Sequence, residues 1–554
     1  MNCTRYFDAY LNGLAKHPEK VALGGKKSGV WKTYTYSQLE EESLSLSNGL
    51  LKLGLEKEDK VITISGNKPE SFIIDFAVTQ IGGIHVPIYP NYNSDDFSFV
   101  IEQCEPKIVF VSGLVIFKMV NKILKELGLS SKVVLIDGKS ETTLKELQEI
   151  PTLEEKQTIY KLRENVKPED IYSIYYTSGT GGGPKGAVYT HGSISMIDYI
   201  GEVIQASESD ISLSYLPMSH AYERPHIFTM LNIGASVYFA TSTASIIENL
   251  QEIKPSFMTT VPVLIEKVLD GIKAKTNSIP EGKQEAYLGL IDEAVSQDIS
   301  LFYKNSSKIA VHPFAEKWRE ILGGKLRLIG SAGAPLSNAV NQFYHAIGIP
   351  VLECYGLTEV AMGTYNIMPS KVKCGSVGLA ARGVEIKLSP IDNEILIKSP
   401  FVTKEIYKIP VLTKDLADNE GYFRTGDIGE IDEEGFIFIK GRKKELFKLQ
   451  NGRYFTSVPV ENLLKQSPLI ENVIIYEEAG SIVCVINPAQ AENEDLTEEE
   501  TERRLWKEIH TLHNDTVLEV ERINELIVDY SVWSIENGKL TPTMKVKRFK
   551  VINN

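Results

Sequence analysis

The chain has 554 residues, more than one compact hydrophobic core supports, so at least two domains are expected. Hydrophobic residues make up 43% and charged residues 24%, which is ordinary for a globular protein. The formal net charge of -14 argues against a general nucleic-acid binder, because such a protein needs a basic surface.

The first residues, MNCTRYFDAYLNGLAKHPEK, include acids and contain no apolar stretch, so a signal peptide is not expected. The five cysteines lie far apart, at positions 3, 104, 354, 374 and 484. None forms a CxxC pair or a Cys/His cluster with zinc spacing. This pattern suits a reducing cytosol, and we expect a cytoplasmic protein.

Short runs of β-forming residues alternate with helix-like segments in the first third of the chain. The runs are Val61–Ser65, Lys107–Val111, Val133–Ile136 and Tyr172–Tyr176. Before them, Ser37 and Glu40 fit a capping box that opens a helix. Strands that alternate with helices predict an α/β fold, with mixed or largely parallel sheets flanked by helices.

The stretch Pro225–Ile247 contains no formal charge and is long enough to span a bilayer. It nevertheless carries several polar residues, among them His226 and Asn232, and a glycine at position 234. That polarity favours a buried helix and a strand, broken at Gly234, over a membrane span.

The pattern of the sequence changes near residue 440, where two strand-forming segments are followed by a polar one. The segments Gly421–Asp427 and Ile431–Ile439 predict a strand, a turn and a second strand. The polar segment Gly441–Glu445 that follows is suited to a hinge. We therefore expect a large N-terminal domain over residues 1–440 and a small α+β C-terminal domain over residues 441–554.

The segment Tyr176–Gly186, YTSGTGGGPKG, is the strongest local signal in the chain. Three successive glycines are costly in a plain strand or helix, so a turn is expected. A glycine-rich turn with hydroxyls and a lysine can wrap phosphate oxygens, although a flexible surface loop has a similar composition. The GxxxxGK[ST] order of a Walker loop is absent.

Five further segments follow in order: LPMSHAYER (216–224), SAGAPL (331–336), YGLTE (355–359), FRTGD (423–427) and LTPTMKVKR (540–548). Together with the glycine-rich segment, they resemble the motifs of the adenylate-forming superfamily, and most of all those of long-chain fatty acid–CoA ligases. The sequence departs from that pattern at Gly181, where the family has Thr or Ser. It departs again at Val263, where the VPRxxEK segment of fatty acid ligases has arginine.

The resemblance implies a set of nucleotide and CoA contacts. Phosphates would be bound by Thr177, Ser178, Gly179, Thr180, Gly182 and Lys185. Adenine would lie against Gly333, Ala334, Pro335, Tyr355 and Gly356, and the ribose would be bound by Asp427 and Arg442. Lys444 would be the hinge residue, and the backbone of Gly452 would line the path of pantetheine.

The resemblance also assigns the chemistry. Lys545 would be the catalytic lysine, and His220 would lie near the carboxylate and the adenylate. Thr358 would contact the α-phosphate or the acyl-adenylate. Glu359 and Thr180 would hold Mg²⁺, a hard cation that takes its remaining oxygen ligands from ATP.

Some charged residues in these motifs have simpler explanations. Glu223 and Arg224 fit a structural ion pair as well as a role in the site. Lys547, Arg548 and Lys550 fit a basic tail, or a contact to CoA phosphates or to anionic lipid.

These observations predict an ATP-dependent ligase that joins a long-chain fatty acid to CoA through an acyl-adenylate, releasing pyrophosphate and AMP. The alternatives are an acyl-AMP ligase that loads an acyl carrier protein, a CoA ligase for short-chain or aryl acids, and a non-catalytic nucleotide-binding homologue. Retention of Lys545, Glu359 and Asp427 argues against the last. Peripheral membrane contact and a homodimer stay open.

Overall fold

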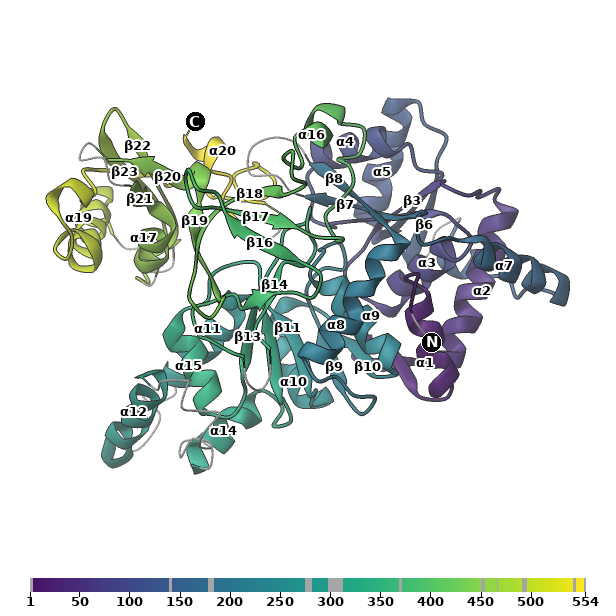
Figure 1. Cartoon of the computed structure of the whole chain (residues 1–554), viewed down its shortest axis with the longest axis horizontal. Helices are drawn as coiled ribbons and strands as arrows, with labels where there is room; N and C mark the ends of the chain where they lie inside the picture. Colours follow the sequence, from purple (N-terminus) through teal and green to yellow (C-terminus); the bar gives the residue numbers. More distant parts are fainter. Residues whose placement is uncertain are drawn as a thin grey trace.

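A computed structural model describes residues 3–138, 142–177, 184–274, 281–296, 312–367, 371–449, 454–465, 467–490, 496–541 and 545–552 (Figure 1). The N-terminal segments form two large sheets, and the last hundred residues form a smaller body at one end of the molecule.

One large sheet contains all four predicted β-runs. Its strand order is β6 (Lys132–Asp137), β5 (Ile108–Ser112), β3 (Lys60–Ile64), β4 (Ile84–Ile88), β7 (Ile171–Thr177) and β8 (Lys185–Thr190). These strands are parallel up to β7, and β8 pairs antiparallel with β7. After its first residue, β3 is entirely buried, which explains why it reads as a continuous apolar run.

The second sheet gathers strands from distant parts of the chain. Its order is β15 (Leu379–Ala380), β14 (Thr364–Tyr365), β13 (Val351–Tyr355), β12 (Leu328–Ser331), β11 (Phe257–Thr260), β9 (Ile211–Ser214), β10 (Ser236–Phe239), β1 (Val21–Lys27) and β2 (Val30–Thr35). The strands from β13 to β1 are parallel, and the flanking strands pair antiparallel. The prediction of an α/β fold with mixed sheets is confirmed.

An antiparallel sheet follows in the chain, formed by β16 (Glu385–Leu388), β17 (Glu394–Lys398), β18 (Phe423–Ile431) and β19 (Ile437–Arg442). Strands β18 and β19 are the predicted strand–turn–strand unit. Their register places Asp427 directly opposite Arg442.

Helices connect the strands and pack against the sheets (Figure 1). The helices before residue 166 are α1 (Asp8–Lys16), α2 (Tyr36–Lys52), α3 (Pro69–Thr79), α4 (Ser94–Cys104), α5 (Leu114–Leu127), α6 (Leu144–Leu147) and α7 (Leu153–Asn165). Further along are α8 (Met196–Val203), α9 (Glu223–Ile233), α10 (Ile246–Ile253), α11 (Pro262–Ala274), α12 (Glu281–Ser296), α14 (Pro313–Ile321), α15 (Asn338–Ala346) and α16 (Pro410–Lys414).

The predicted start of α2 is wrong by two residues. The capping box is formed by Thr35 and Gln38, whose side chains each bond the other's backbone N–H. Glu40 instead accepts a 2.9 Å hydrogen bond from Arg163 of α7, because this tertiary ion pair draws its carboxylate away from the helix start.

The uncharged stretch Pro225–Ile247 contains most of helix α9 and all of strand β10, as predicted. Gly234 ends the helix with a φ of +87°, a left-handed conformation that glycine adopts without strain. Across the described ranges, no helix is long and apolar enough to cross a membrane.

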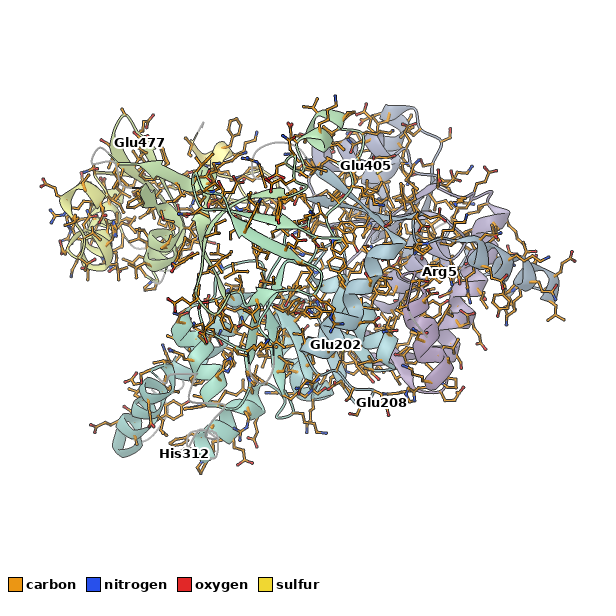
Figure 2. The ribbon with its side chains drawn as sticks, viewed as in Figure 1. Arg5, Glu202, Glu208, His312, Glu405 and Glu477 are labelled. Atoms are coloured by element: carbon orange, nitrogen blue, oxygen red, sulfur yellow. The ribbon has the colours of Figure 1, made fainter. Side chains whose placement is uncertain are left out.

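The smaller body contains β20 (Leu446–Lys448), β21 (Tyr454–Thr456), β22 (Ile470–Glu478), β23 (Ser481–Pro488) and β24 (Glu525–Val528), with helices α17 (Ser457–Leu464), α19 (Glu498–Ile509) and α20 (Arg548–Ile552). Its apolar side chains form clusters that contain no residue before position 447. Figure 2 shows Glu477 near its outer tip, on the far side from the large sheets. The boundary at residue 441 stays a prediction.

Candidate active site

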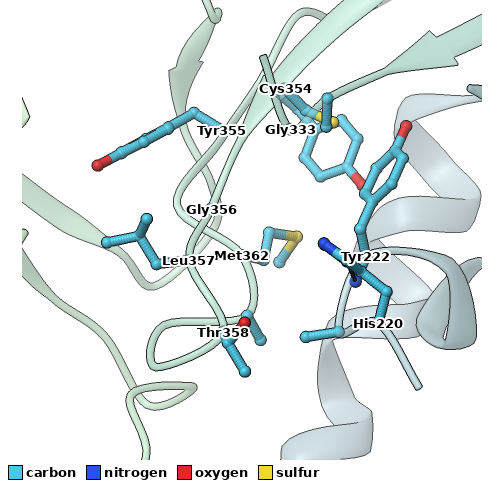
Figure 3. Close-up of a pocket in the computed structure, with 13 residues that line it drawn as sticks. His220, Tyr222, Gly333, Cys354, Tyr355, Gly356, Leu357, Thr358 and Met362 are labelled. Atoms are coloured by element: carbon cyan, nitrogen blue, oxygen red, sulfur yellow. Dashed lines mark hydrogen bonds between the residues drawn. The ribbon is translucent and has the colours of Figure 1, made fainter. Parts of the chain in front are cut away.

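A pocket of about 390 Å³, partly open to solvent, lies where strands β12 and β13 end and where the loop after β9 passes over them. In open α/β sheets, ligands bind beyond the carboxyl ends of the strands. Figure 3 shows His220 and Tyr222 on one wall and the segment from Tyr355 to Met362 on the other. The predicted residues His220, Gly333, Tyr355, Gly356 and Thr358 all line this pocket.

His220 is held in a defined orientation at the wall of the pocket. Its Nδ1 accepts a hydrogen bond of 3.1 Å from the backbone N–H of Tyr222. Burial, and then the charge of Lys545, lower the pKa of His220 to about 4, so the imidazole is neutral near pH 7. With Nδ1 occupied as an acceptor, Nε2 carries the proton and can donate to an anionic oxygen.

Tyr355, Asp427 and Arg442 form a polar group beside the pocket. The hydroxyl of Tyr355 donates to Asp427 Oδ2 at 2.6 Å, and Arg442 Nε lies 3.0 Å from Asp427 Oδ1. Burial raises the pKa of Asp427, while Arg442 and the Tyr355 hydroxyl oppose that shift. The two predicted ribose ligands are therefore adjacent, and their positions follow from the register of β18 and β19.

Lys545, from the small body, reaches the large one at this pocket. Its Nζ donates to the carbonyl oxygen of Gly333 at 2.8 Å. Gly333 has a φ of +88°, a conformation that strains residues with a side chain, and it presents this carbonyl to the ammonium. The pKa of Lys545 is lowered by loss of water around the ammonium and then by Arg442, although the side chain keeps solvent contact.

The glycine-rich segment is described only at its two ends. Thr177 ends β7 and Lys185 begins β8, and the two residues are paired across the antiparallel ladder. The predicted residues Ser178, Gly179, Thr180 and Gly182 lie outside the described residues, as do Gly181 and Gly452. The predicted contacts of these residues to phosphate and pantetheine stay predictions.

Glu359 follows Thr358 on the loop after β13 and is half-buried. Within the described ranges its carboxylate has no hydrogen bond or ion pair, so it is available to a cation. No three His, Cys, Asp or Glu side chains of the described residues are grouped so that they could hold a metal ion. A Mg²⁺ bound here would therefore depend on ATP oxygens for most of its ligands, as the sequence predicts.

The structural ion pair considered for Glu223 and Arg224 is wrong. Arg224 pairs instead with Asp75 of α3, with 2.6 Å between its Nη2 and Asp75 Oδ2, and both side chains are fully buried. Glu223 accepts a short hydrogen bond from Thr259, and burial raises its pKa to about 7. Neither side chain lines the pocket.

The basic C-terminal residues do not form a uniform tail. Arg548 donates to Glu461 at 2.6 Å and to the carbonyl of Ile475 at 3.0 Å, so it stabilises the small body. Lys547 lies 3.9 Å from Asp96 of α4 and contributes a second contact between the two bodies. The predicted hinge residue Lys444 is exposed in a short turn after β19.

The inner wall of the pocket was not predicted from the sequence. Tyr365 from β14 closes it, and its hydroxyl is 2.8 Å from Nε2 of His226. Tyr222 lies beside His226, with the ring centroids 4.7 Å apart. Because Tyr365 belongs to no recognisable motif and its partner is 139 residues away in sequence, no local signal could have found it.

Val263, which replaces the family's arginine, lies in the first turn of α11 and is 54% exposed. The side chain at this position therefore lies at the surface rather than in the core.

The fold and this pocket together define an adenylate-forming enzyme, the class whose members activate a carboxylate with ATP. The family of AMP-binding enzymes matches residues 12–407, and the chain belongs to that family.

Relatives of known sequence cover almost the whole chain. It is 28% identical to long chain acyl-CoA synthetase 5 of Arabidopsis thaliana, with 98% of this chain and 89% of that protein covered. It is 27% identical to long-chain-fatty-acid–CoA ligase 5 of Rattus norvegicus, over 98% of this chain and 86% of that protein.

Solved structures of the same fold include the anthranilate CoA ligase AuaEII in complex with anthranoyl-AMP (TM-score 0.75, 18% identity, 99% of this chain and 96% of that one). ATP-bound MatB from Rhodopseudomonas palustris has a TM-score of 0.71 and 20% identity, over 100% of this chain and 98% of that one. These similarities establish the fold, with a large N-terminal and a small C-terminal domain.

Proposed function

We propose that this protein ligates a long-chain fatty acid to CoA in two steps, forming an acyl-adenylate from ATP and then a thioester. The observation that supports this most directly is the Lys545 ammonium, 2.8 Å from the Gly333 carbonyl, at the pocket lined by His220 and Thr358. The small domain thus delivers a cation to the place where a carboxylate and an α-phosphate would meet.

The first step must overcome repulsion between two anions, the carboxylate and the triphosphate. A carboxylate oxygen attacks the α-phosphorus, the bond to the β-phosphate oxygen breaks, and pyrophosphate leaves. Lys545 and the neutral Nε2–H of His220 can stabilise the negative charge on the oxygens involved. Mg²⁺ bound with ATP would neutralise part of the triphosphate charge, and Glu359 is the described residue suited to hold it.

The second step requires the thiol of CoA at the same acyl carbon, with AMP leaving. No side-chain nucleophile is needed, and burial raises the pKa of Cys354, the cysteine at the pocket, to about 12. In the present arrangement Lys545 occupies one approach to the pocket. We propose that the C-terminal domain, from residue 441 onward, rotates about Lys444 and so withdraws Lys545 from the pocket, as in hinge-type domain motion.

Support for a long acyl chain comes from the relatives, which are long-chain acyl-CoA synthetases at 25–28% identity. The pocket itself is closed by Tyr222 and Tyr365 and is too small to hold both an adenylate and an extended chain. A long chain therefore requires that this aromatic wall move. Loading of an acyl carrier protein, and activity on short-chain or aryl acids, remain the competing functions.

The test is pyrophosphate release with acids from acetate to oleate and with benzoate, with and without CoA. The proposal predicts an optimum at palmitate or oleate and turnover that depends on CoA. Activity confined to acetate or aromatic acids would contradict the long-chain assignment. Pyrophosphate release that continues only when an acyl carrier protein replaces CoA would favour the carrier-protein alternative.

Replacing Tyr365 by alanine should shift the preference toward longer acids. Because Tyr365 closes the inner end of the pocket, its removal opens space for additional methylenes. The ratio of kcat/KM for palmitate to that for octanoate should rise about tenfold, a typical size for pocket contacts to a few methylenes. Steady-state kinetics with the two acids would measure this ratio.

Tyr365→Phe is the matched control, since it keeps the ring and loses only the hydroxyl, which bonds His226. Its palmitate-to-octanoate ratio should stay within twofold of the unmodified enzyme. An equal fall in both activities for Tyr365→Ala, with no change in the ratio, would contradict the assignment of this wall.

A further inference from the structure

A second pocket, of about 760 Å³ and partly open to solvent, lies away from the candidate active site and shares no lining residue with it. It is formed by the β1–β2 hairpin, the turn between β3 and α3, and the end of β10. Four lysines, Lys26, Lys27, Lys32 and Lys68, line its wall together with two acids, Glu70 and Asp137.

The four lysines differ in how their charges are compensated. Lys26 is bound by Glu248 and Glu252 of α10, at 2.9 and 2.8 Å, and Lys68 is bound by Asp137. Lys27 and Lys32 have no carboxylate partner among the described residues, and Lys32 contacts only the hydroxyl and ring of Tyr34. Two ammonium groups on one hairpin therefore line the pocket without an ion pair among the described residues, and Glu70 lies nearby, bonded to the hydroxyl of Tyr34 at 3.2 Å.

The turn before α3 completes the wall. Gly66 needs glycine neither for its backbone angle nor for packing, because a Cβ built there meets nothing within 4 Å. The missing side chain leaves backbone open to the pocket. Helix α3 starts just beyond, at Pro69, with no side-chain cap at Lys68, so its positive end lies at this wall, although Pro69 has no N–H and the N–H of Ser71 donates to the carbonyl of Lys68.

This turn is also rigid. The side chain of Asn67 accepts a 2.8 Å hydrogen bond from the N–H of Met218 and donates to the carbonyl of Leu216, anchoring the turn to the loop after β9. Gly25 of β1 packs directly against Pro69, since a Cβ on Gly25 would come within 2.6 Å of its ring. The wall is therefore preorganised, which reduces the entropic cost of binding.

We propose that this pocket binds a molecule carrying a phosphate monoester, held by Lys27, Lys32 and the backbone around Gly66. A phosphate dianion matches two ammonium groups that have no carboxylate bonded to them, and it offers several acceptor oxygens to separate donors. The pocket is partly open to solvent, so the rest of the ligand can extend out of it. This inference does not depend on the proposed function.

The test is calorimetric titration with glycerol 3-phosphate, with a non-hydrolysable ATP analogue present to fill the candidate active site. We expect one glycerol 3-phosphate per chain. The double variant Lys27→Gln/Lys32→Gln should raise its Kd at least fivefold. Lys125→Gln, which removes an exposed lysine on α5 that does not line this pocket, should leave the Kd within twofold.

Gly66→Leu is an independent second variant, because its side chain enters open space without a clash and should fill the pocket. It should abolish titratable binding while leaving the unfolding temperature unchanged. Absence of binding to the unmodified protein, or the same Kd for the double lysine variant, would overturn the proposal.

Two sources of the phosphate are separated by vesicles of phosphatidylcholine with and without phosphatidic acid. Cosedimentation that requires phosphatidic acid and is inhibited by glycerol 3-phosphate supports the site with a lipid headgroup as its ligand. Calorimetric binding without cosedimentation supports the site with a free phosphate ester.

Discussion

Replacing Lys545 by alanine is expected to slow acyl-adenylate formation by roughly 10²–10³-fold, the usual cost of removing one preorganised charge-stabilising donor. The same variant should convert supplied acyl-adenylate and CoA to the thioester at a nearly normal rate. The reason is geometric: in this structure Lys545 lies at Gly333, where we propose that the carboxylate attacks, and the proposed second step requires that the lysine leave. Pyrophosphate release measures the first step, and thioester formation from synthetic adenylate measures the second.

Lys550→Ala is the matched control, because Lys550 is exposed five residues further along the same segment. It should leave the rate of acyl-adenylate formation, measured as pyrophosphate release, unchanged. Equal loss of the two half-reactions in Lys545→Ala would contradict the alternation of the C-terminal domain between two positions. An unchanged rate of pyrophosphate release would contradict a role for Lys545 in the first step.

The sequence predicts four of the six strands in the first sheet, β3, β5, β6 and β7, because their central residues are buried on both faces, whereas β4 and β8 were not predicted. Such strands, like β3, read as continuous apolar runs whatever surrounds them. The order of the strands in a sheet cannot be predicted in this way. For example, β1 pairs with β10, which follows it by more than two hundred residues. The start of α2 could not be predicted from local sequence either. Two overlapping capping boxes fit the sequence, and the choice between them involves the ion pair of Glu40 with Arg163, which belongs to the tertiary structure.

For the site, the motifs predict which residues gather, and the register of β18 and β19 supplies part of the reason. Asp427 and Arg442 are close because they are cross-strand partners. The motifs could not supply Tyr365 of the inner wall with its partner His226, or the carbonyl of Gly333 that accepts from Lys545. These contacts join segments that no local pattern links, and they bear on chain length and domain position.

Arg224→Met is expected to lower the free energy of unfolding of the large domain by about 3–5 kcal/mol, the usual cost of breaking a buried ion pair. Arg224 is fully buried and donates to Asp75 Oδ2 and to the hydroxyl of Ser173, at 3.1 and 3.0 Å. Its removal leaves the Asp75 carboxylate buried without its guanidinium partner, and burial lowers the pKa of the adjacent His85, which opposes protonation of that imidazole as a replacement cation. Urea denaturation followed by circular dichroism would measure the loss.

The double variant Asp75→Asn/Arg224→Met should regain stability relative to the sum of the two single variants, because it removes the stranded charge together with its partner. Arg382→Met breaks an exposed pair with Glu202 and should cost about 1 kcal/mol or less. Folded Arg224→Met should keep its kcat/KM, because Arg224 does not line the pocket. A stable variant with reduced kcat/KM would instead assign Arg224 to the chemistry, and the family's acidic–basic motif would then be functional rather than structural.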